Sequence, residues 1–405
     1  MTERLYHSDA YLRTFDAMVQ AQDARADGLW LRLDRTAFYP TGGGQPHDLG
    51  TLRTQEKTVR VLDVLADAAG DVWHRVDGEL PAGTAVQGEI DWARRWDHMQ
   101  QHLGEHVLAG SLHQLTGGFT HGLHIGQEVN TIDVTLPDGR TRLTAEEVAA
   151  LELLANRRVQ QDDPVKCWFP DAQEMQALPL RKDPTVDEHV RIVAVGSYEH
   201  VACGGTHVSS TGQVGQIKVL STDPARGKLR VTFVCGMRAL KSFQRVYAAT
   251  QEAGQLLSAP PEELATALRK RLDELAALRE QVSALKEAHA ESLARQLLAD
   301  AASLPQGGRL VKTYLAGQDA EGLKAVAGLL LKAESQVVAL LSAPRGEGAV
   351  LLFARGEQAQ GDMAQLLRQC GAKGGGRPDF AQGSGETQHI QRAYSLLMEA
   401  GRDPS

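Results

Sequence analysis

The sequence predicts an α+β protein built from several domains, and three observations support this. The chain has 405 residues, whereas a single hydrophobic core rarely grows beyond about 250–300 residues. Short β-type runs fill the first hundred residues, helical periodicity follows, and an alternation of strands and helices returns near the C-terminus. We predict a β-rich segment, an α+β domain, a helical linker and a small α/β domain over residues 1–95, 96–240, 241–305 and 306–405.

The first 95 residues are predicted to form a barrel-like β domain. Runs of alternating apolar residues at 30–33, 58–62 and 72–76 are separated by turns rich in Gly, Pro and Asp. This spacing of short strands is typical of small antiparallel barrels.

Two helices and several strands are predicted for the next domain. Helical periodicity covers 96–115, and a second helix over 144–159 opens with a Thr144-x-x-Glu147 capping box. Strands are predicted near 190–197 and 214–235. Helices on one face of an antiparallel sheet would make this an α+β domain.

The region after Met237 is rich in Ala, Leu, Glu and Arg and predicts a helical hairpin or short coiled coil. Pro260 and Pro261 divide it into two helices. An approximate heptad stripe of apolar residues runs along this region; its residues are Leu268, Leu275, Leu278, Val282 and Leu285. Two interpretations stay open: the stripe packs on its own chain, or it forms the seam of a homodimer. Beyond Arg309 the pattern predicts strands and helices of a small α/β domain, at 310–315, 320–334, 337–341, 350–353 and 363–370.

Composition excludes several classes of protein. No apolar run approaches the ~20 residues that span a membrane, and no secretory signal is visible at the N-terminus, so we expect a cytoplasmic protein without a membrane partner. A net charge of −8 argues against indiscriminate nucleic-acid binding, so a tRNA partner would need local basic patches. The scattered cysteines do not form a disulfide framework, and only Cys203 has a ligand-like setting.

Two short motifs predict a metal site. His102 and His106 lie four residues apart in a predicted helix, so both imidazoles project from one face, with His98 one turn earlier. Cys203-Gly-Gly-Thr-His207 brings a thiolate and a third imidazole together around two glycines. Together they supply the N₃S ligand set that zinc prefers.

The role of this metal stays open at the level of the sequence. Four protein ligands would close a tetrahedral zinc, whereas hydrolytic zinc sites usually keep one position open. The metal therefore either activates water or only anchors and polarises the substrate. Glu105 is a conceivable acid or base, but its helical phase differs from that of the histidines, so we expect a solvated glutamate.

A glycine-rich segment, Gly42-Gly43-Gly44-Gln45, lies between β-type runs. Its glycines allow backbone amides to approach a ligand closely, and no Gly-Lys-Ser/Thr follows, so it is not a phosphate loop. In this order, Gly-Gly-Gly-Gln, His-x-x-x-His and Cys-Gly-Gly-Thr-His resemble the editing domain of alanyl-tRNA synthetases and of the free-standing AlaX editing proteins, over roughly residues 1–240.

The resemblance implies specific roles for these residues. His102, His106, Cys203 and His207 would be the zinc ligands, and Gln45 with Gly42, Gly43 and Gly44 would line the editing pocket. Thr120 matches the place of the threonine that recognises the serine hydroxyl. The implied reaction is hydrolysis of Ser-tRNA(Ala), with Gly-tRNA(Ala) as a second candidate, because a site that requires the hydroxyl completes a double sieve. Gln45 is our candidate for orienting the substrate or the attacking water.

The tail also resembles this family, because residues 371–383 are similar to the glycine-rich signature shared by the C-terminal domains of alanyl-tRNA synthetases and DHH-type phosphoesterases. Its glycines, with Lys373 and Arg377, suit phosphate or single-stranded nucleic acid, so we assign tRNA binding to this domain, with a structural glycine loop as the alternative. We find no ATP-binding motifs and expect action in trans. The rival functions are a tRNA-binding protein with a structural zinc and, less favoured because no Asp-His-His motif is present, a phosphoesterase.

Overall fold

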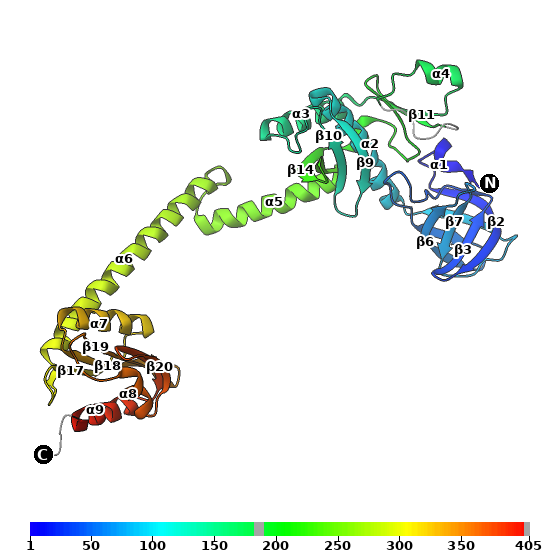
Figure 1. Ribbon diagram of the computed structural model, residues 1–405. Helices are drawn as coiled ribbons and strands as arrows, with labels where there is room; N and C mark the ends of the chain where they lie inside the picture. The colour runs from blue at the N-terminus through cyan, green and yellow to red at the C-terminus, as the bar shows by residue number, and fades with distance from the viewer. Residues whose placement is uncertain (182–189, 401–405) are drawn as a thin grey trace. The chain divides into compact units, whose positions relative to one another are not determined.

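The computed structural model describes residues 1–181 and 190–400 and separates into two compact units (Figure 1). The first unit covers Met1–Glu252, and the second begins at Ala253. Both units combine helices with strands, so the predicted α+β class is confirmed.

A closed six-stranded barrel begins the first unit (Figure 1). Apolar side chains alternate along its strands and fill the interior; Leu31 and Val64, for example, are fully buried. Around the barrel the strands are β2 (Thr14–Arg25), β3 (Gly28–Leu33), β7 (Val72–Val76), β6 (Thr58–Ala66), β5 (Gly50–Arg53) and β8 (Ala85–Ile90).

Helix α2 (Trp92–Thr116) follows the barrel directly and is the structural centre of the first unit. It begins where the Asp91 side chain accepts a hydrogen bond from the Arg94 amide, and it ends at Gly117, whose φ of 69° suits glycine. Residues 98–112 are all buried, so the helix is enclosed on every side. The predicted helix began about one turn too late.

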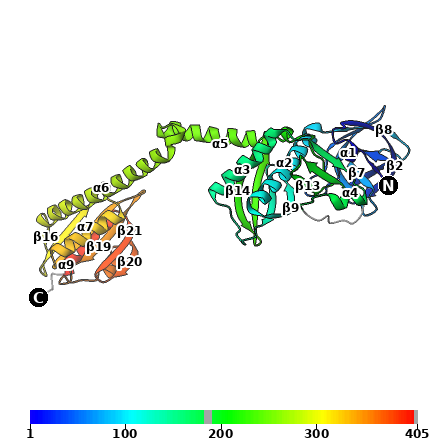
Figure 2. The same cartoon turned by 90° about the horizontal axis from the view of Figure 1, so that it is seen from above.

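A four-stranded antiparallel sheet packs against α2 and α3 (Ala145–Gln161) (Figure 2). The predicted capping box of Thr144 and Glu147 is present at the start of α3. The strands, in spatial order, are β14 (Ile217–Ala225), β15 (Lys228–Cys235), β10 (Asn130–Thr135) and β9 (Phe119–Ile125).

A second, three-stranded antiparallel sheet precedes the Cys203 segment. Its strands are β11 (Val165–Trp168), β12 (Ile192–Val195) and β13 (Glu199–Ala202). Short elements complete the unit: β1 (Glu3–Arg4), which pairs with β4 (Arg35–Thr36), α1 (Leu5–Ser8), α4 (Ala172–Ala177) and the 3₁₀ turn η1 (Thr211–Val214).

Two long helices cover the predicted linker region. They are α5 (Gly236–Leu257) and α6 (Leu264–Ala299), and the Pro260–Pro261 break falls between them, beside the 3₁₀ turn η2 (Pro261–Glu263). The five residues of the predicted heptad stripe are exposed on α6. Whether this stripe forms a coiled coil stays a prediction.

The second unit contains a six-stranded mixed sheet with helices on both faces. Figure 1 shows α7 on one face and α8 and α9 on the other, and separate apolar clusters fill the two sides. Strands β17 and β18 are parallel and joined through α7, as in a βαβ unit. The elements are β16 (Ala302–Ser303), β17 (Arg309–Tyr314), α7 (Ala320–Ala333), β18 (Val337–Arg345), β19 (Gly348–Arg355), α8 (Met363–Gln369), β20 (Lys373–Arg377), β21 (Phe380–Gly385) and α9 (Gln388–Ala400).

Candidate functional site

Helix α2 presents His102 and His106 side by side. Their ring centroids lie 5.2 Å apart and the rings are nearly parallel. This is the arrangement expected for residues four apart on one helical face. His98, one turn earlier, is buried but lines a different cavity, so it does not join the pair.

The segment after β13 brings Cys203 and His207 to the same place. The Cys203 Sγ lies 3.3 Å from His102 Nε2 and 3.5 Å from His207 Nε2, and the Nε2 atoms of His106 and His207 lie 3.1 Å apart. Ligand atoms of all four residues lie within 4.8 Å of one another. A Cβ at Gly205 would lie 2.2 Å from the His102 ring, so only glycine fits there.

Burial determines the electrostatics of this cluster. It lowers the pKa of His102 to about 3, and it lowers the pKa values of His106 and His207 well below their usual range. Neutral imidazoles are the form that binds a metal. Burial also raises the pKa of the Cys203 thiol to about 12, so a metal must displace its proton to bind the thiolate.

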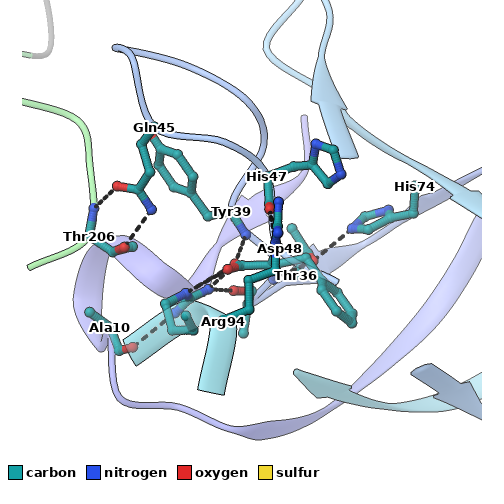
Figure 3. A network of polar contacts seen from close by, with 12 residues as sticks. Ala10, Thr36, Tyr39, Gln45, His47, Asp48, His74, Arg94 and Thr206 are labelled. Atoms are coloured by element: carbon teal, nitrogen blue, oxygen red, sulfur yellow. Dashed lines mark hydrogen bonds and ion pairs between the residues drawn. The ribbon is translucent and has the colours of Figure 1, made fainter. Parts of the chain in front are cut away.

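Gln45 is held by two hydrogen bonds to Thr206 (Figure 3) and in turn holds His102 in the orientation that a metal ligand needs. The Thr206 amide donates to Gln45 Oε1 over 3.1 Å, and Gln45 Nε2 donates to Thr206 Oγ1 over 2.8 Å, which identifies the amide oxygen. The same oxygen lies 2.8 Å from His102 Nδ1. His102 therefore carries its proton on Nδ1, and its Nε2 lone pair faces the cluster.

A buried ion pair fixes the glycine-rich segment to α2. Arg95 binds both carboxylate oxygens of Asp48, and Asp48 also accepts a 2.6 Å hydrogen bond from the Tyr39 amide (Figure 3). Neither charged side chain is exposed. Because Arg95 lies two turns before His102 on the same helix, this pair sets the register between Gln45 and the histidine.

A cavity of about 560 Å³ opens onto the cluster, within the size range of small-ligand sites. Gly42, Gly43 and Thr120 line it. Gln45 and Gly44 do not, because Gln45 is fully buried and Gly44 packs against the Leu123 carbonyl. The lining also includes cationic and aromatic residues, Arg4, Arg181, Arg191, Tyr6, Tyr39 and Phe169.

The prediction of a solvated Glu105 is wrong. Glu105 is 6% exposed, lines the cavity, and places a carboxylate oxygen 3.3 Å from His106 Nδ1. The helical phase misled the prediction because α2 is enclosed on every side, so that a residue away from the ligand face still points into the protein.

The glycine-rich tail forms an edge strand and not a loop. Residues Lys373–Arg377 are β20, which pairs with β21 along its whole length and lies at the end of the sheet. The structural glycine loop given as the alternative is therefore wrong for these residues. Lys373 and Arg377 are nevertheless exposed on this strand.

Several residues of the site were missed from the sequence. Thr206 lies within the Cys-Gly-Gly-Thr-His motif and could have been noticed as a polar residue between ligands. Arg191 donates to the carbonyls of Cys203 and Gly205 over 3.0 and 2.9 Å and so shapes the ligand segment. No local pattern marks Arg191 or Arg181, because their contacts are made in the folded chain.

Family models match three parts of this chain. They are described as "tRNA synthetases class II (A)" for residues 8–94, "Threonyl and Alanyl tRNA synthetase second additional domain" for residues 190–232, and "DHHA1 domain" for residues 307–400. The second match contains Cys203 and His207.

One relative matches from end to end. The alanyl-tRNA editing protein AlaX-L of Pyrococcus horikoshii is 31% identical over 409 residues, which cover 98% of either chain. This chain belongs to the alanyl-tRNA editing protein family. The resemblance inferred from the motifs is confirmed.

Alanine–tRNA ligases are similar to this editing-family chain over part of their length. Those of Pyrococcus abyssi and Pyrobaculum neutrophilum are 35% and 34% identical, over 94% and 98% of this chain. The chain spans less than half of these relatives, 42% and 44% of their lengths. Among solved structures, the C-Ala domain of Aquifex aeolicus alanyl-tRNA synthetase matches 24% of this chain and 95% of its own, with 21% identity and a TM-score of 0.23.

In residues 1–181 and 190–400, no helix is both long enough and apolar enough to cross a membrane.

Proposed function

We propose that this member of the alanyl-tRNA editing family is a trans-acting deacylase, which hydrolyses the aminoacyl ester of mischarged Ser-tRNA(Ala) and, as a second substrate, Gly-tRNA(Ala). The observation that carries the proposal is the convergence of His102, His106, Cys203 and His207 beside a cavity that Thr120 also lines. Alignment with the editing protein AlaX-L over 98% of either chain supports the editing activity.

The four side chains fit a zinc ion. Three imidazole nitrogens and one thiol sulfur form the N₃S set that zinc prefers. The Nδ1 atom of His207 is buried without a hydrogen-bond partner, and the Nε2 atoms of His106 and His207 meet at 3.1 Å, where two neutral lone pairs repel unless a cation or proton lies between them. Bound there, zinc would supply positive charge that attracts the substrate's polar atoms at its ester end.

The protein's own groups would place the ester for hydrolysis. Gly43 and Gly204 line the cavity, and a Cβ at either glycine would meet open space, so the peptide groups on that side are accessible to a developing oxyanion. Thr120 would contact the side chain of the amino acid. Gln45 acts through His102 and Thr206, so it is a positioning residue and does not touch the substrate.

In the second unit, Lys373 and Arg377 are our candidates for tRNA contacts. Both are exposed on the edge strand β20, where glycines let a phosphate approach the backbone.

The exposed stripe on α6 is a candidate seam for a homodimer. Light scattering across a dilution series tests this, and a mass that stays that of a monomer would refute the homodimer.

The direct test is hydrolysis of Ser-tRNA(Ala), Gly-tRNA(Ala) and Ala-tRNA(Ala) by the wild-type chain under single-turnover conditions. We expect rapid hydrolysis of the seryl ester, whereas the alanyl ester should stay intact. Only serine has the side-chain hydroxyl that the site requires. Equal rates for serine and alanine would contradict the proposed specificity.

A second candidate function is a tRNA-binding protein with a structural zinc. It is favoured by one observation, that four protein ligands complete a tetrahedral site. Tight tRNA binding without hydrolysis of any of the three esters would support this second function.

A further inference from the structure

We propose that Arg181 is a specificity-determining residue, which orients the Thr120 hydroxyl so that its proton is donated to the side-chain hydroxyl of the substrate. The inference deepens the proposed function and rests on it. Arg181 is the last residue of the described range 1–181. Both Arg181 and Thr120 line the cavity.

Arg181 connects a buried carboxylate to the threonine. Its Nε donates to Glu199 Oε1 over 2.7 Å, and its Nη1 donates to Thr120 Oγ1 over 2.9 Å. The side chains of Arg181 and Glu199 are only 8% and 1% exposed. A planar guanidinium held at two points has little freedom, so the direction of its bond to Thr120 is fixed.

Glu199 is itself held in place by the fold. It is the first residue of β13 and packs against α2 at Gly110, where a Cβ would lie 2.7 Å from Glu199 Oε2. Burial raises the pKa of Glu199, and the neighbouring Arg181 guanidinium offsets part of this rise. The ion pair therefore forms a rigid support behind Thr120 that does not leave a lone charge facing the cavity.

The proton count at Thr120 follows from the chemistry of the two groups. A guanidinium has only donors, so the Thr120 oxygen must be the acceptor of that bond. The hydroxyl has a single proton, which this bond does not use, and it can therefore turn toward the cavity. Thr120 thus becomes a donor to the oxygen of a serine side chain.

This arrangement separates the three candidate amino acids. A serine hydroxyl accepts the Thr120 proton, whereas the methyl group of alanine cannot and leaves that donor without a partner on the substrate. Glycine has no side-chain atom to reach Thr120. Arg181 should therefore matter for serine and not for glycine.

The test compares the kcat/KM of Ser-tRNA(Ala) and Gly-tRNA(Ala) hydrolysis for wild type, Arg181→Met, Thr120→Val and the double variant. Arg142→Met, an exposed arginine in the same unit, is the matched control. We expect Arg181→Met to lower the rate on the seryl ester by about 10- to 100-fold and on the glycyl ester by less than about 3-fold. The double variant should be no slower than Thr120→Val, because both changes remove one interaction.

Two results would overturn the role of Arg181: an equal loss on both esters, or additive losses in the double variant. Because Arg181→Met leaves Glu199 as a buried charge, the same comparison is made in a Glu199→Gln background, where that charge is absent. Rescue of the seryl preference by Arg181→Lys would also contradict the inference, since a lysine paired with Glu199 lacks the second fixed donor. A wild-type chain that hydrolyses neither ester would instead refute the proposed function.

Discussion

The two units carry their candidate functional residues in opposite ways. In the first unit, the cluster of His102, His106, Cys203 and His207 is largely buried, and His102 is positioned by a hydrogen bond to the buried Gln45. In the second, Lys373 and Arg377 project from an exposed edge strand. A buried cluster acts through preorganised contacts, whereas exposed residues act through accessible charge, so we expect mutations in the two units to differ in the size of their effects and in salt dependence.

The largest effect is expected when the buried ion pair that fixes α2 is broken. Asp48→Ala leaves Arg95 as an uncompensated buried charge and should lower the free energy of unfolding by about 3–5 kcal/mol. Urea titration followed by tryptophan fluorescence measures this, because all five tryptophans lie in the first unit. The matched control is Asp138→Ala, which removes an exposed partner of Arg140 and should barely move the midpoint. Similar urea midpoints for both variants would show that the buried ion pair contributes no more to stability than the exposed one.

Loss of the amide that holds His102 should have the next largest effect. Gln45→Ala removes the acceptor for His102 Nδ1, and comparable outer partners of metal ligands contribute about 10- to 100-fold to metal affinity or activity. We expect the loss in kcat and in zinc affinity, with little change in KM, because Gln45 lies outside the cavity lining. Kinetics on Ser-tRNA(Ala) and a zinc titration test this, and unchanged values in both would refute the positioning role.

The barrel should add a pH dependence to the stability of the first unit. His74 is fully buried, and burial lowers its pKa to about 4. Between its unfolded pKa near 6.5 and this value, the unfolded chain binds the proton first, so stability is lost as the pH falls through that window.

The comparison of wild type with His74→Gln isolates this histidine. From pH 7 to pH 5 the wild type should lose about 1–2 kcal/mol more unfolding free energy than the variant. Urea midpoints at both pH values measure the difference. Parallel losses in the two proteins would show that His74 does not titrate in this window.

The smallest effects are expected on the edge strand of the second unit. Lys373→Ala or Arg377→Ala should weaken tRNA binding only about 2- to 5-fold and lower the salt slope of the affinity by about 1. Lys332→Ala, an exposed lysine at the end of α7, is the control. A loss that does not depend on salt would mean that these residues do not contact phosphate.

What could be predicted from the sequence was mostly local. The capping box at Thr144, the break at Pro260 and the spacing of His102 and His106 each concern a few neighbouring residues, and the structure contains all of these features. The periodicity of the barrel strands was equally visible, because one face of each strand is buried.

The rest depends on contacts between distant segments. Glu105 is buried because α2 is surrounded by other elements, which its own periodicity could not show. Residues 373–377 form a strand only because β21 pairs with them, although their glycines favour a loop. Arg181 acquires its role from Glu199 and Thr120, which lie 18 and 61 residues away in the chain.

We propose that the buried cluster of the first unit holds a zinc ion and hydrolyses a mischarged ester. The most direct measurement is single-turnover hydrolysis of Ser-tRNA(Ala) by wild type and Cys203→Ala, with zinc content and circular dichroism measured on the same samples. We predict that wild type contains zinc and clears the ester, and that the variant loses zinc and activity together while it stays folded. A zinc-loaded wild type that leaves the ester intact, or a zinc-free variant that hydrolyses it at the wild-type rate, would contradict this account.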